Sequence, residues 1–363
     1  MNILLLLTDL FDSSGGIQTF NRCLVKAVDQ AAATRNWGMK VLVLNDQGKS
    51  DLAPLYMSGH RQKYRGFAGS RLRFVTQGVL QSRRAKVVIL GHAHFAPLAP
   101  FMGNTHRFLV AYGIDVWDRL TVFERAGISQ ISKILSISQY TRDRMAEANQ
   151  IKQERFEVIP CTLDPSRDRR VAEKPRESLG LPEGRMILTV SRLEASERYK
   201  NIDLAIRAMP FILTEAPDAY LVVVGDGSDR KRLEQTAQDL RVQHKVLFRG
   251  TVADALLSDY YQACDLFVLP SVREGFGIVF LDAMCRGKPC VAARAGGLPE
   301  VVEDGRTGIL VEPGDEKALT RAMIRLLTDP AMRTAMGQAG QKRFYGELSF
   351  DRFSERLEAV LWD

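Results

Sequence analysis

The chain has 363 residues, 45% of them hydrophobic and 26% charged, with a formal net charge of +7 and a pI near 9.2. This length is more than one ordinary domain needs and allows two buried cores. The mild positive charge suits an anionic partner, namely a nucleotide, a nucleic acid or an acidic membrane surface, and does not choose among them. No stretch approaches the length of a membrane-spanning helix.

The apolar start of the chain, residues 3–8, is followed immediately by Asp9 and Asp12 and has no cationic residues before it. We interpret it as a buried strand rather than a signal peptide. The five cysteines are scattered without metal-ligand spacing, which favours reduced, packed thiols. The expected location is the cytoplasm, with a peripheral position on the cytoplasmic face of the inner membrane as an extension of that expectation.

Short apolar runs alternate with longer amphipathic stretches along the chain. Continuous apolar strands separated by helices are typical of parallel sheets covered on both faces. The runs are 3–8, 40–45, 86–91, 107–112, 133–138 and 156–160 in the first half, and 186–191, 219–227, 245–250, 265–271, 289–293 and 308–311 in the second. They predict an α/β protein with two doubly wound, Rossmann-like domains, whose loops at the strand ends would face a shared cleft.

Residues 163–185 are polar and charged, with turn signals at Pro165, Pro175 and Pro182, and we interpret them as the interdomain crossing. The predicted domains are therefore 1–165 and 183–346. The final segment, 347–363, has a helical pattern with its apolar residues on one face.

The loop after the first strand contains Gly15 and Gly16 at the start of a predicted helix. Glycines there let the backbone approach a ligand, and the helix N-terminus offers free N–H groups to an anion. A tight strand-to-helix turn is the plainer interpretation. The loop lacks both the dinucleotide fingerprint and the phosphate-binding lysine motif, which disfavours NAD enzymes and ATPases.

The second half supplies positive charge around a loop of its own. Arg192 lies at the end of the strand 186–191, and Lys200 lies at the start of the next helix. Two cations flanking one loop can bind a diphosphate and neutralise it as a leaving group. The alternative is a pair of solvated surface cations, which is also the role expected for the neighbouring Arg198.

The segment "REGFGIVFLDAM" (273–284) follows the apolar run 265–271. Gly275 and Gly277 expose amides at a helix start, which suits an anion. Glu274 is placed to accept hydrogen bonds from sugar hydroxyls, or else to cap the helix. Asp282 lies in an apolar helix where a carboxylate needs a partner, and vicinal ribose hydroxyls would provide one.

In combination, these motifs resemble the retaining nucleotide-sugar glycosyltransferases of the GT-B fold, specifically glycosyltransferase family 4. The shared features are the Gly-Gly-Ile loop, the Arg192…Lys200 pair, the "VVVGDG" run that contains Gly225, and E-G-F-G followed by Asp282. The resemblance extends from the first strand to the final helix. It implies that the helix in 347–363 returns to complete the first domain.

The resemblance also implies roles for individual residues. Gly16 would donate its N–H to the distal phosphate, Arg192 and Lys200 would bind the diphosphate, and Glu274 would face the donor sugar. The amides of Phe276, Gly277 and Ile278 would lie near sugar and phosphate oxygens, Asp282 would hold the ribose, and Val252 would meet the base. The reaction would be a front-side displacement in which the leaving diphosphate helps to deprotonate the acceptor. Because the sequence has no Asp-x-Asp pair and no His/Cys cluster, we expect neither a metal nor another cofactor.

Asp282 and Tyr112 depart from the family pattern. Asp282 stands where a glutamate is usual, so a direct ribose contact could be replaced by a water-mediated one. Tyr112 stands where many members have a histidine, and it is predicted on the acceptor side. Asp115 and His94 are the alternative catalytic groups of the first domain, although a structural role for His94 is equally open.

A basic, aromatic segment in the first domain includes Arg61, Lys63, Arg65 and Arg71. It predicts either a solvated surface or a rim that contacts anionic lipid headgroups or a polyprenyl-diphosphate carrier. Nucleic acid is disfavoured because no recognised binding motif is present.

The expected function is transfer of a hexose from UDP-hexose or GDP-mannose to a lipid-linked glycan in bacterial surface polysaccharide or glycoconjugate synthesis. UDP is slightly favoured as the commoner donor nucleotide of the family. The alternatives are a nucleotide-sugar epimerase on the same scaffold and a non-catalytic nucleotide-sugar-binding protein.

Overall fold

The computed structural model describes residues 2–13, 15–58, 62–167 and 176–362. The chain divides into two compact units, the first formed by Met1–Asp164 with Ser349–Asp363 and the second by Pro165–Leu348. The second unit begins before residue 183, where the sequence analysis placed its start. Arg176, in η3 (Arg176–Leu179), lies before residue 183 and already packs on this unit: it donates hydrogen bonds to the Ala263 carbonyl oxygen at 3.0 Å and to the Asp265 carboxylate at 2.9 Å.

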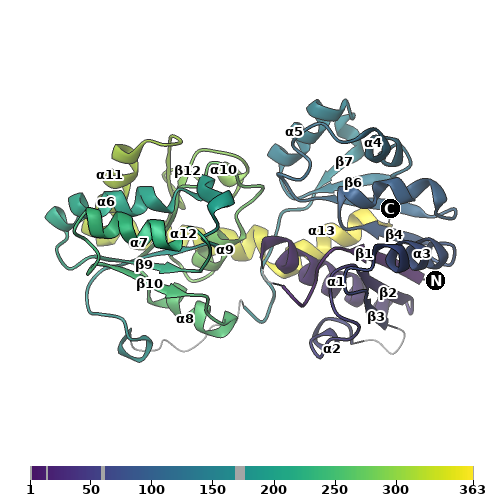
Figure 1. The fold of residues 1–363 in the computed structure, drawn as a ribbon, viewed down its shortest axis with the longest axis horizontal. Helices are drawn as coiled ribbons and strands as arrows, with labels where there is room; N and C mark the ends of the chain where they lie inside the picture. The colour runs from purple at the N-terminus through teal and green to yellow at the C-terminus, as the bar shows by residue number, and fades with distance from the viewer. Residues whose placement is uncertain (1, 14, 59–61, 168–175, 363) are drawn as a thin grey trace. The chain divides into compact units, whose positions relative to one another are not determined.

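The first unit is built on a seven-stranded parallel sheet with the order β3-β2-β1-β4-β5-β6-β7 among the described residues (Figure 1). Its strands are β1 (Asn2–Leu7), β2 (Gly38–Val43), β3 (Gln62–Gly66), β4 (Val87–Leu90), β5 (His106–Ala111), β6 (Lys133–Ser136) and β7 (Phe156–Val158). Its helices are α1 (Gly16–Thr34), α2 (Ala53–Tyr56), α3 (Arg71–Ser82), η1 (Ala93–Phe101), α4 (Val122–Ile128), α5 (Gln139–Asn149), η2 (Gln153–Arg155) and α13 (Phe350–Trp362).

The edge strand β3 was not predicted, because Tyr64 is its one large apolar residue among polar and charged neighbours. Lys63 and Arg65 point to the exposed face, and Tyr64 points inward, where its hydroxyl donates to Asp46 Oδ2 at 2.9 Å. Exposed cations on an edge strand are a common protection against pairing with another chain.

The last helix, α13, belongs to the first unit and lies beside α1 (Figure 1). Phe353 packs edge-on against Phe20 of α1, with ring centroids 5.5 Å apart, and Trp362 packs against Trp37 at 4.9 Å. The apolar face of this helix therefore completes the core of the first unit.

The second unit is built on a six-stranded parallel sheet with the order β10-β9-β8-β11-β12-β13 among the described residues. Its strands are β8 (Met186–Val190), β9 (Tyr220–Val224), β10 (Val246–Gly250), β11 (Leu266–Leu269), β12 (Cys290–Ala293) and β13 (Gly308–Val311). After η3, its helices are η4 (Ala195–Lys200), α6 (Ile202–Glu215), α7 (Arg230–Asp239), α8 (Asp254–Ala263), α9 (Ile278–Met284), α10 (Leu298–Val301), α11 (Glu316–Thr328), α12 (Pro330–Arg343) and η5 (Phe344–Leu348).

In both sheets the chain runs outward in one direction from a central strand and then returns to that strand's other side. This reversal lies between β1 and β4 in the first unit and between β8 and β11 in the second. Open parallel sheets bind ligands beyond the carboxyl ends of the strands at such a reversal point. The predicted pair of doubly wound, Rossmann-like domains is confirmed.

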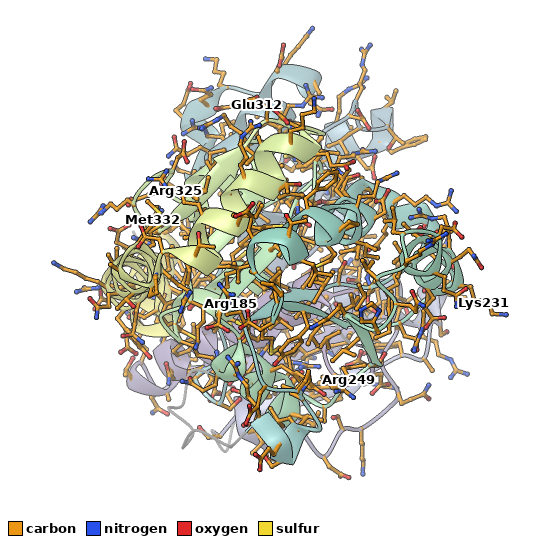
Figure 2. All side chains as sticks on the ribbon, turned by 90° about the vertical axis from the view of Figure 1, so that its left-hand side faces the viewer. Arg185, Lys231, Arg249, Glu312, Arg325 and Met332 are labelled. Atoms are coloured by element: carbon orange, nitrogen blue, oxygen red, sulfur yellow. The ribbon has the colours of Figure 1, made fainter. Side chains whose placement is uncertain are left out.

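A surface groove runs along the edge strand β13 and α11, and Figure 2 shows Glu312 and Arg325 of its lining on one face of the second unit. In the described part of the chain, the residues that line this groove include none of those predicted to bind the donor.

Candidate active site residues in the two units

In the second unit, the loops that follow β8 and β11 lie against each other at the reversal point. The Val272 N–H donates to the Tyr199 carbonyl oxygen at 2.9 Å, and the Asn201 side-chain amide donates to the Pro270 carbonyl oxygen at 3.0 Å. The sheet order makes β8 and β11 neighbours, so residues far apart in the sequence are brought together here.

Lys200 and Glu274 form a direct ion pair across these two loops. Both side chains are largely buried, with exposed fractions of 18% and 13%. Burial lowers the pKa of Lys200, but the adjacent Glu274 carboxylate outweighs burial and holds that pKa above its ordinary value. The structure therefore brings together two of the residues predicted to form the donor site.

The other predicted cation of this site, Arg192, pairs with Glu197, and its side chain is 65% exposed. Arg198 is also mostly exposed and donates to Asp229 at 2.9 Å. Arg192 is thus accessible to an anion at the end of β8, whereas Arg198 is held on the surface by a carboxylate of another loop.

The glycines of "VVVGDG" allow the loop after β9 to pack against the loop after β8. Gly225 has a φ of +130°, and a Cβ on it would overlap the Ser191 carbonyl oxygen. The Leu193 N–H donates to the Asp226 carbonyl oxygen at 2.9 Å. Gly225 therefore allows the close approach of the two loops that holds the backbone near Arg192 in place.

Gly277 immediately precedes α9 and lies in the left-handed region, with a φ of +96°, and a Cβ on it would lie 2.8 Å from Leu298 Cδ2. The loop that contains Glu274 to Gly277 packs on Gly296 and Gly297, whose role the sequence analysis missed. The Gly297 N–H donates to the Glu274 carbonyl oxygen at 2.8 Å. The signal in the sequence was the Gly-Gly pair that follows the apolar run 289–293.

Asp282 of α9 is buried, with an exposed fraction of 2%, and its Oδ2 accepts a hydrogen bond from Arg167 Nη2 at 2.8 Å. Arg286 lies 3.8 Å from Oδ1. Burial raises the pKa of Asp282, against the two arginines, which lower it. The partner that this carboxylate needs is an arginine in the structure, and the ribose contact stays a prediction.

The predicted base contact, Val252, lies in the loop between β10 and α8 and is partly exposed. This loop follows the edge strand of the sheet.

In the first unit, the loop that carries Gly15 and Gly16 is positioned by Asp46, another residue that the sequence analysis missed. The Asp46 carboxylate is buried and accepts hydrogen bonds from the Leu10 and Phe11 N–H groups at 3.1 and 2.8 Å. Its signal was a single acid directly after the second apolar run. α1 begins at Gly16, as predicted, and the binding of an anion at this helix start stays a prediction.

Tyr112 was expected on the acceptor or membrane side, and the structure places it in the core of the first unit instead. Its hydroxyl donates to Asn21 Oδ1 at 2.5 Å, and its ring packs edge-on against Phe20 at 5.5 Å. Burial raises the pKa of Tyr112 well above its ordinary value. Its neighbours on α1 account for a tyrosine at this position.

The other first-unit candidates, His94 and Asp115, follow β4 and β5. His94 is exposed, and its Nδ1 lies 2.6 Å from Glu124 Oε1. Asp115 is mostly buried, with Oδ2 3.9 Å from His92 Nε2. His94 therefore lies at the reversal point between β1 and β4, and Asp115 lies after β5, the strand next to β4.

The basic segment lies on β3 and the start of α3. Lys63, Arg65 and Arg71 are exposed, and so is Leu72, at 77%. Arg61 lies outside the described residues.

Within the described ranges, no helix is both long and apolar enough to cross a membrane. The same ranges contain no cluster of three or more His, Cys, Asp or Glu side chains suited to a metal ion. The expectation of a metal-free reaction stays a prediction.

Similarity to known proteins identifies the family. The family model described as "Glycosyl transferases group 1" matches residues 171–343. The GDP-mannose-dependent alpha-(1-6)-phosphatidylinositol monomannoside mannosyltransferase of Mycolicibacterium smegmatis is 35% identical over 265 residues, which cover 69% of this chain and 68% of that protein. The chain belongs to the group 1 glycosyl transferases.

A second relative and a solved structure are also similar to this chain. The GDP-mannose-dependent monoacylated alpha-(1-6)-phosphatidylinositol monomannoside mannosyltransferase of Corynebacterium glutamicum is 31% identical over 76% of this chain and 73% of that protein. The crystal structure of Anabaena Alr3699/HepE in complex with UDP has a TM-score of 0.81 and 21% identity, covering 99% of both chains, which shows the shared GT-B fold. The predicted family is confirmed, and membership favours a glycosyl transferase over the epimerase and the non-catalytic binding protein.

Proposed function

We propose that this chain transfers a mannosyl residue from GDP-mannose, with retention of configuration and without a metal, to a hydroxyl group of a lipid-linked acceptor. The observation that carries the proposal is the Lys200–Glu274 pair at the reversal point of the second sheet, with Arg192 nearby at the end of β8. A cation and a sugar-facing carboxylate are the two groups that a sugar diphosphate needs side by side.

The preference for GDP-mannose over UDP-hexose comes from the relatives. The mannosyltransferases of Mycolicibacterium smegmatis and Corynebacterium glutamicum each match along more than two thirds of this chain, and both are named GDP-mannose-dependent. This reverses the slight preference for UDP that family frequency suggested.

In the proposed reaction, Arg192, Lys200 and the amides of Phe276, Gly277 and Ile278 stabilise the charge of the departing diphosphate. Lys200 and Arg192 already have carboxylate partners. The diphosphate would therefore replace Glu274 and Glu197 as the acceptor of part of the hydrogen bonds that these two cations donate. Glu274 would then be released toward the sugar hydroxyls.

Thermal unfolding in EDTA, with GDP, GDP-mannose, UDP and UDP-glucose, tests the donor. A ligand that binds only the folded state raises the melting temperature by mass action. We expect GDP-mannose to give the largest shift, and Glu274→Ala to remove its excess over GDP. A shift with UDP-glucose alone would show that the donor is UDP-glucose and not GDP-mannose. The absence of a shift with any nucleotide would overturn the proposal. Labelled-donor product assays and NMR of the product's anomeric proton test transfer and retention.

The acceptor and location are proposed as a lipid-linked glycan or polyol reached from the cytoplasmic face of the inner membrane. The exposed cations Lys63, Arg65 and Arg71 lie in one stretch of the chain with the exposed Leu72, a combination that suits anionic headgroups. Flotation with phosphatidylglycerol vesicles should be lost when these three cations are replaced by serine. A charge-matched control replaces Arg119, Arg144 and Lys152, which are exposed elsewhere on the first unit. Equal flotation of both variants would contradict the proposal.

A further inference from the structure

Two histidines follow β4 in the first unit and differ sharply in their surroundings. His94 has a 73% exposed side chain, while His92 is largely buried, and their ring centroids lie 4.4 Å apart. His92 precedes η1, so both rings stand where the sheet reverses direction between β1 and β4.

The Glu124 carboxylate fixes which nitrogen of His94 carries the hydrogen. Its Oε1 lies 2.6 Å from His94 Nδ1, and its Oε2 accepts from the N–H and hydroxyl of Thr121 at 2.8 and 2.7 Å. Burial raises the pKa of Glu124, but these donors outweigh burial and hold that pKa below its ordinary value. An ionised carboxylate only accepts, so Nδ1 of His94 carries a hydrogen, and in the neutral form of the ring Nε2 then presents a lone pair.

His92 holds the backbone of His94 in place. Its Nδ1 accepts from the His94 N–H at 3.2 Å, so its hydrogen is on Nε2, which lies 3.9 Å from Asp115 Oδ2. Burial lowers the pKa of His92 to about 4, which keeps the ring neutral near pH 7 and able to accept.

A purely structural explanation leaves the exposed ring of His94 unexplained. The capping box of α4 needs Thr121 and Glu124 alone. The first turn of α4 also exposes Val122 and Phe123, at 68% and 77%, immediately before the buried Glu124. A hydrogen-bond acceptor on a ring that contacts α4, whose first turn exposes apolar side chains, suits a ligand that has both hydroxyl and apolar parts.

We propose that Nε2 of His94 accepts a hydrogen bond from a hydroxyl of a polyol substrate, with Glu124 as the residue that positions the ring. The inference rests on the proposed transferase function and adds a hydroxyl-binding site in the first unit. The hydroxyl can belong to the acceptor or to the donor sugar, and the experiment distinguishes the two.

The test compares His94→Gln and Glu124→Gln with the control Thr121→Ala, which removes the helix cap and leaves the Glu124–His94 contact. We expect the KM of one substrate to rise about tenfold in the first two variants, as for one lost hydrogen bond, and less than twofold in the control. A raised acceptor KM with unchanged donor hydrolysis identifies the acceptor. A raised donor KM identifies the donor sugar. Unchanged KM values in His94→Gln, or equal effects in Thr121→Ala, would overturn the proposal.

A second measurement remains informative if no transfer activity is found. Nitrogen-15 NMR of the His94 ring should show hydrogen on Nδ1 in the wild type and redistribution to Nε2 in Glu124→Gln. Titration with myo-inositol, methyl α-mannoside or GDP-mannose should shift the Nε2 signal saturably. If none of these compounds shifts it, the hydroxyl site is refuted independently of the proposed reaction.

Discussion

Arg167 Nη2 lies 2.8 Å from Asp282 Oδ2, and the Arg167 carbonyl oxygen accepts from Arg286 at 2.7 Å. The second unit thus holds the beginning of its own chain to α9 through a buried carboxylate. Removing Arg167 leaves the buried carboxylate with Arg286, 3.8 Å from its Oδ1, as the remaining charge partner, whereas removing Arg167 and Asp282 together leaves no buried carboxylate.

We therefore expect Arg167→Met to lower the free energy of unfolding by about 3 kcal/mol or more. The double variant Arg167→Met, Asp282→Leu should lose clearly less than the sum of the two single variants. Urea unfolding of the three variants measures this coupling, and additive losses would show that the pair contributes nothing specific.

The Lys200–Glu274 pair predicts a difference between two neighbouring cations. Lys200→Met removes the cation at the proposed diphosphate site, so we expect product formation to fall about a hundredfold or more. Arg198→Met removes a mostly exposed cation two positions earlier and should change the rate less than twofold. Initial rates at saturating donor give the comparison, and equal losses in both variants would remove Lys200 from the proposed mechanism.

Gly297 supports the loop that contains Glu274 at a position without space for a side chain. A Cβ there would overlap the Gly275 carbonyl oxygen, although the φ of −81° is open to any residue. We expect Gly297→Ala to destabilise the protein by about 1–3 kcal/mol through overpacking and to weaken donor binding. Gly314→Ala is the control, since Gly314 has a φ of +78° and a Cβ added to it would meet no atoms within 4 Å. That variant should cost about 1 kcal/mol in backbone strain and leave donor binding intact, as thermal unfolding with and without donor would show.

Asp115 predicts a pH dependence of stability. Burial raises its pKa from 3.8 to about 6, so the folded state keeps this proton after the unfolded state has lost it. The contribution of Asp115 to the free energy of unfolding therefore falls as pH rises from about 4 to about 6, by about 3 kcal/mol in total. It stays low above that range. Asp115→Asn lacks this loss, so its stability relative to the wild type should improve over the same interval. Urea unfolding at pH 4, 5, 6 and 7 measures it, and a constant difference would contradict the raised pKa.

The sequence predicted the sheets well because their central strands are continuous apolar runs, as β1 and β9 illustrate with residues 3–7 and 220–224. It missed β3, where Lys63 and Arg65 alternate with Tyr64, because an edge strand needs only one buried face. The second unit begins earlier than predicted because the contacts of Arg176 are made to residues far along the chain, which turn signals cannot reveal.

At the candidate site, the sequence identified Lys200 and Glu274 through their motifs and their places after apolar runs. It could not foresee the partners that a fold brings from elsewhere. Arg167 reaches Asp282 across 115 positions, and Glu124 reaches His94 across 30. Local sequence patterns identify a residue that needs a partner, and the sheet order and loop packing determine which residue becomes that partner.

The position of α13 has a consequence for how the protein forms on the ribosome. Phe20 and Trp37 are synthesised before the second unit, but Phe353 and Trp362 follow only after the whole of it. The second unit is continuous in the sequence and can close as soon as its own residues emerge. The first unit has to keep part of its apolar core open until the second unit has been synthesised, so the unit that is begun first is the later one to reach its final form.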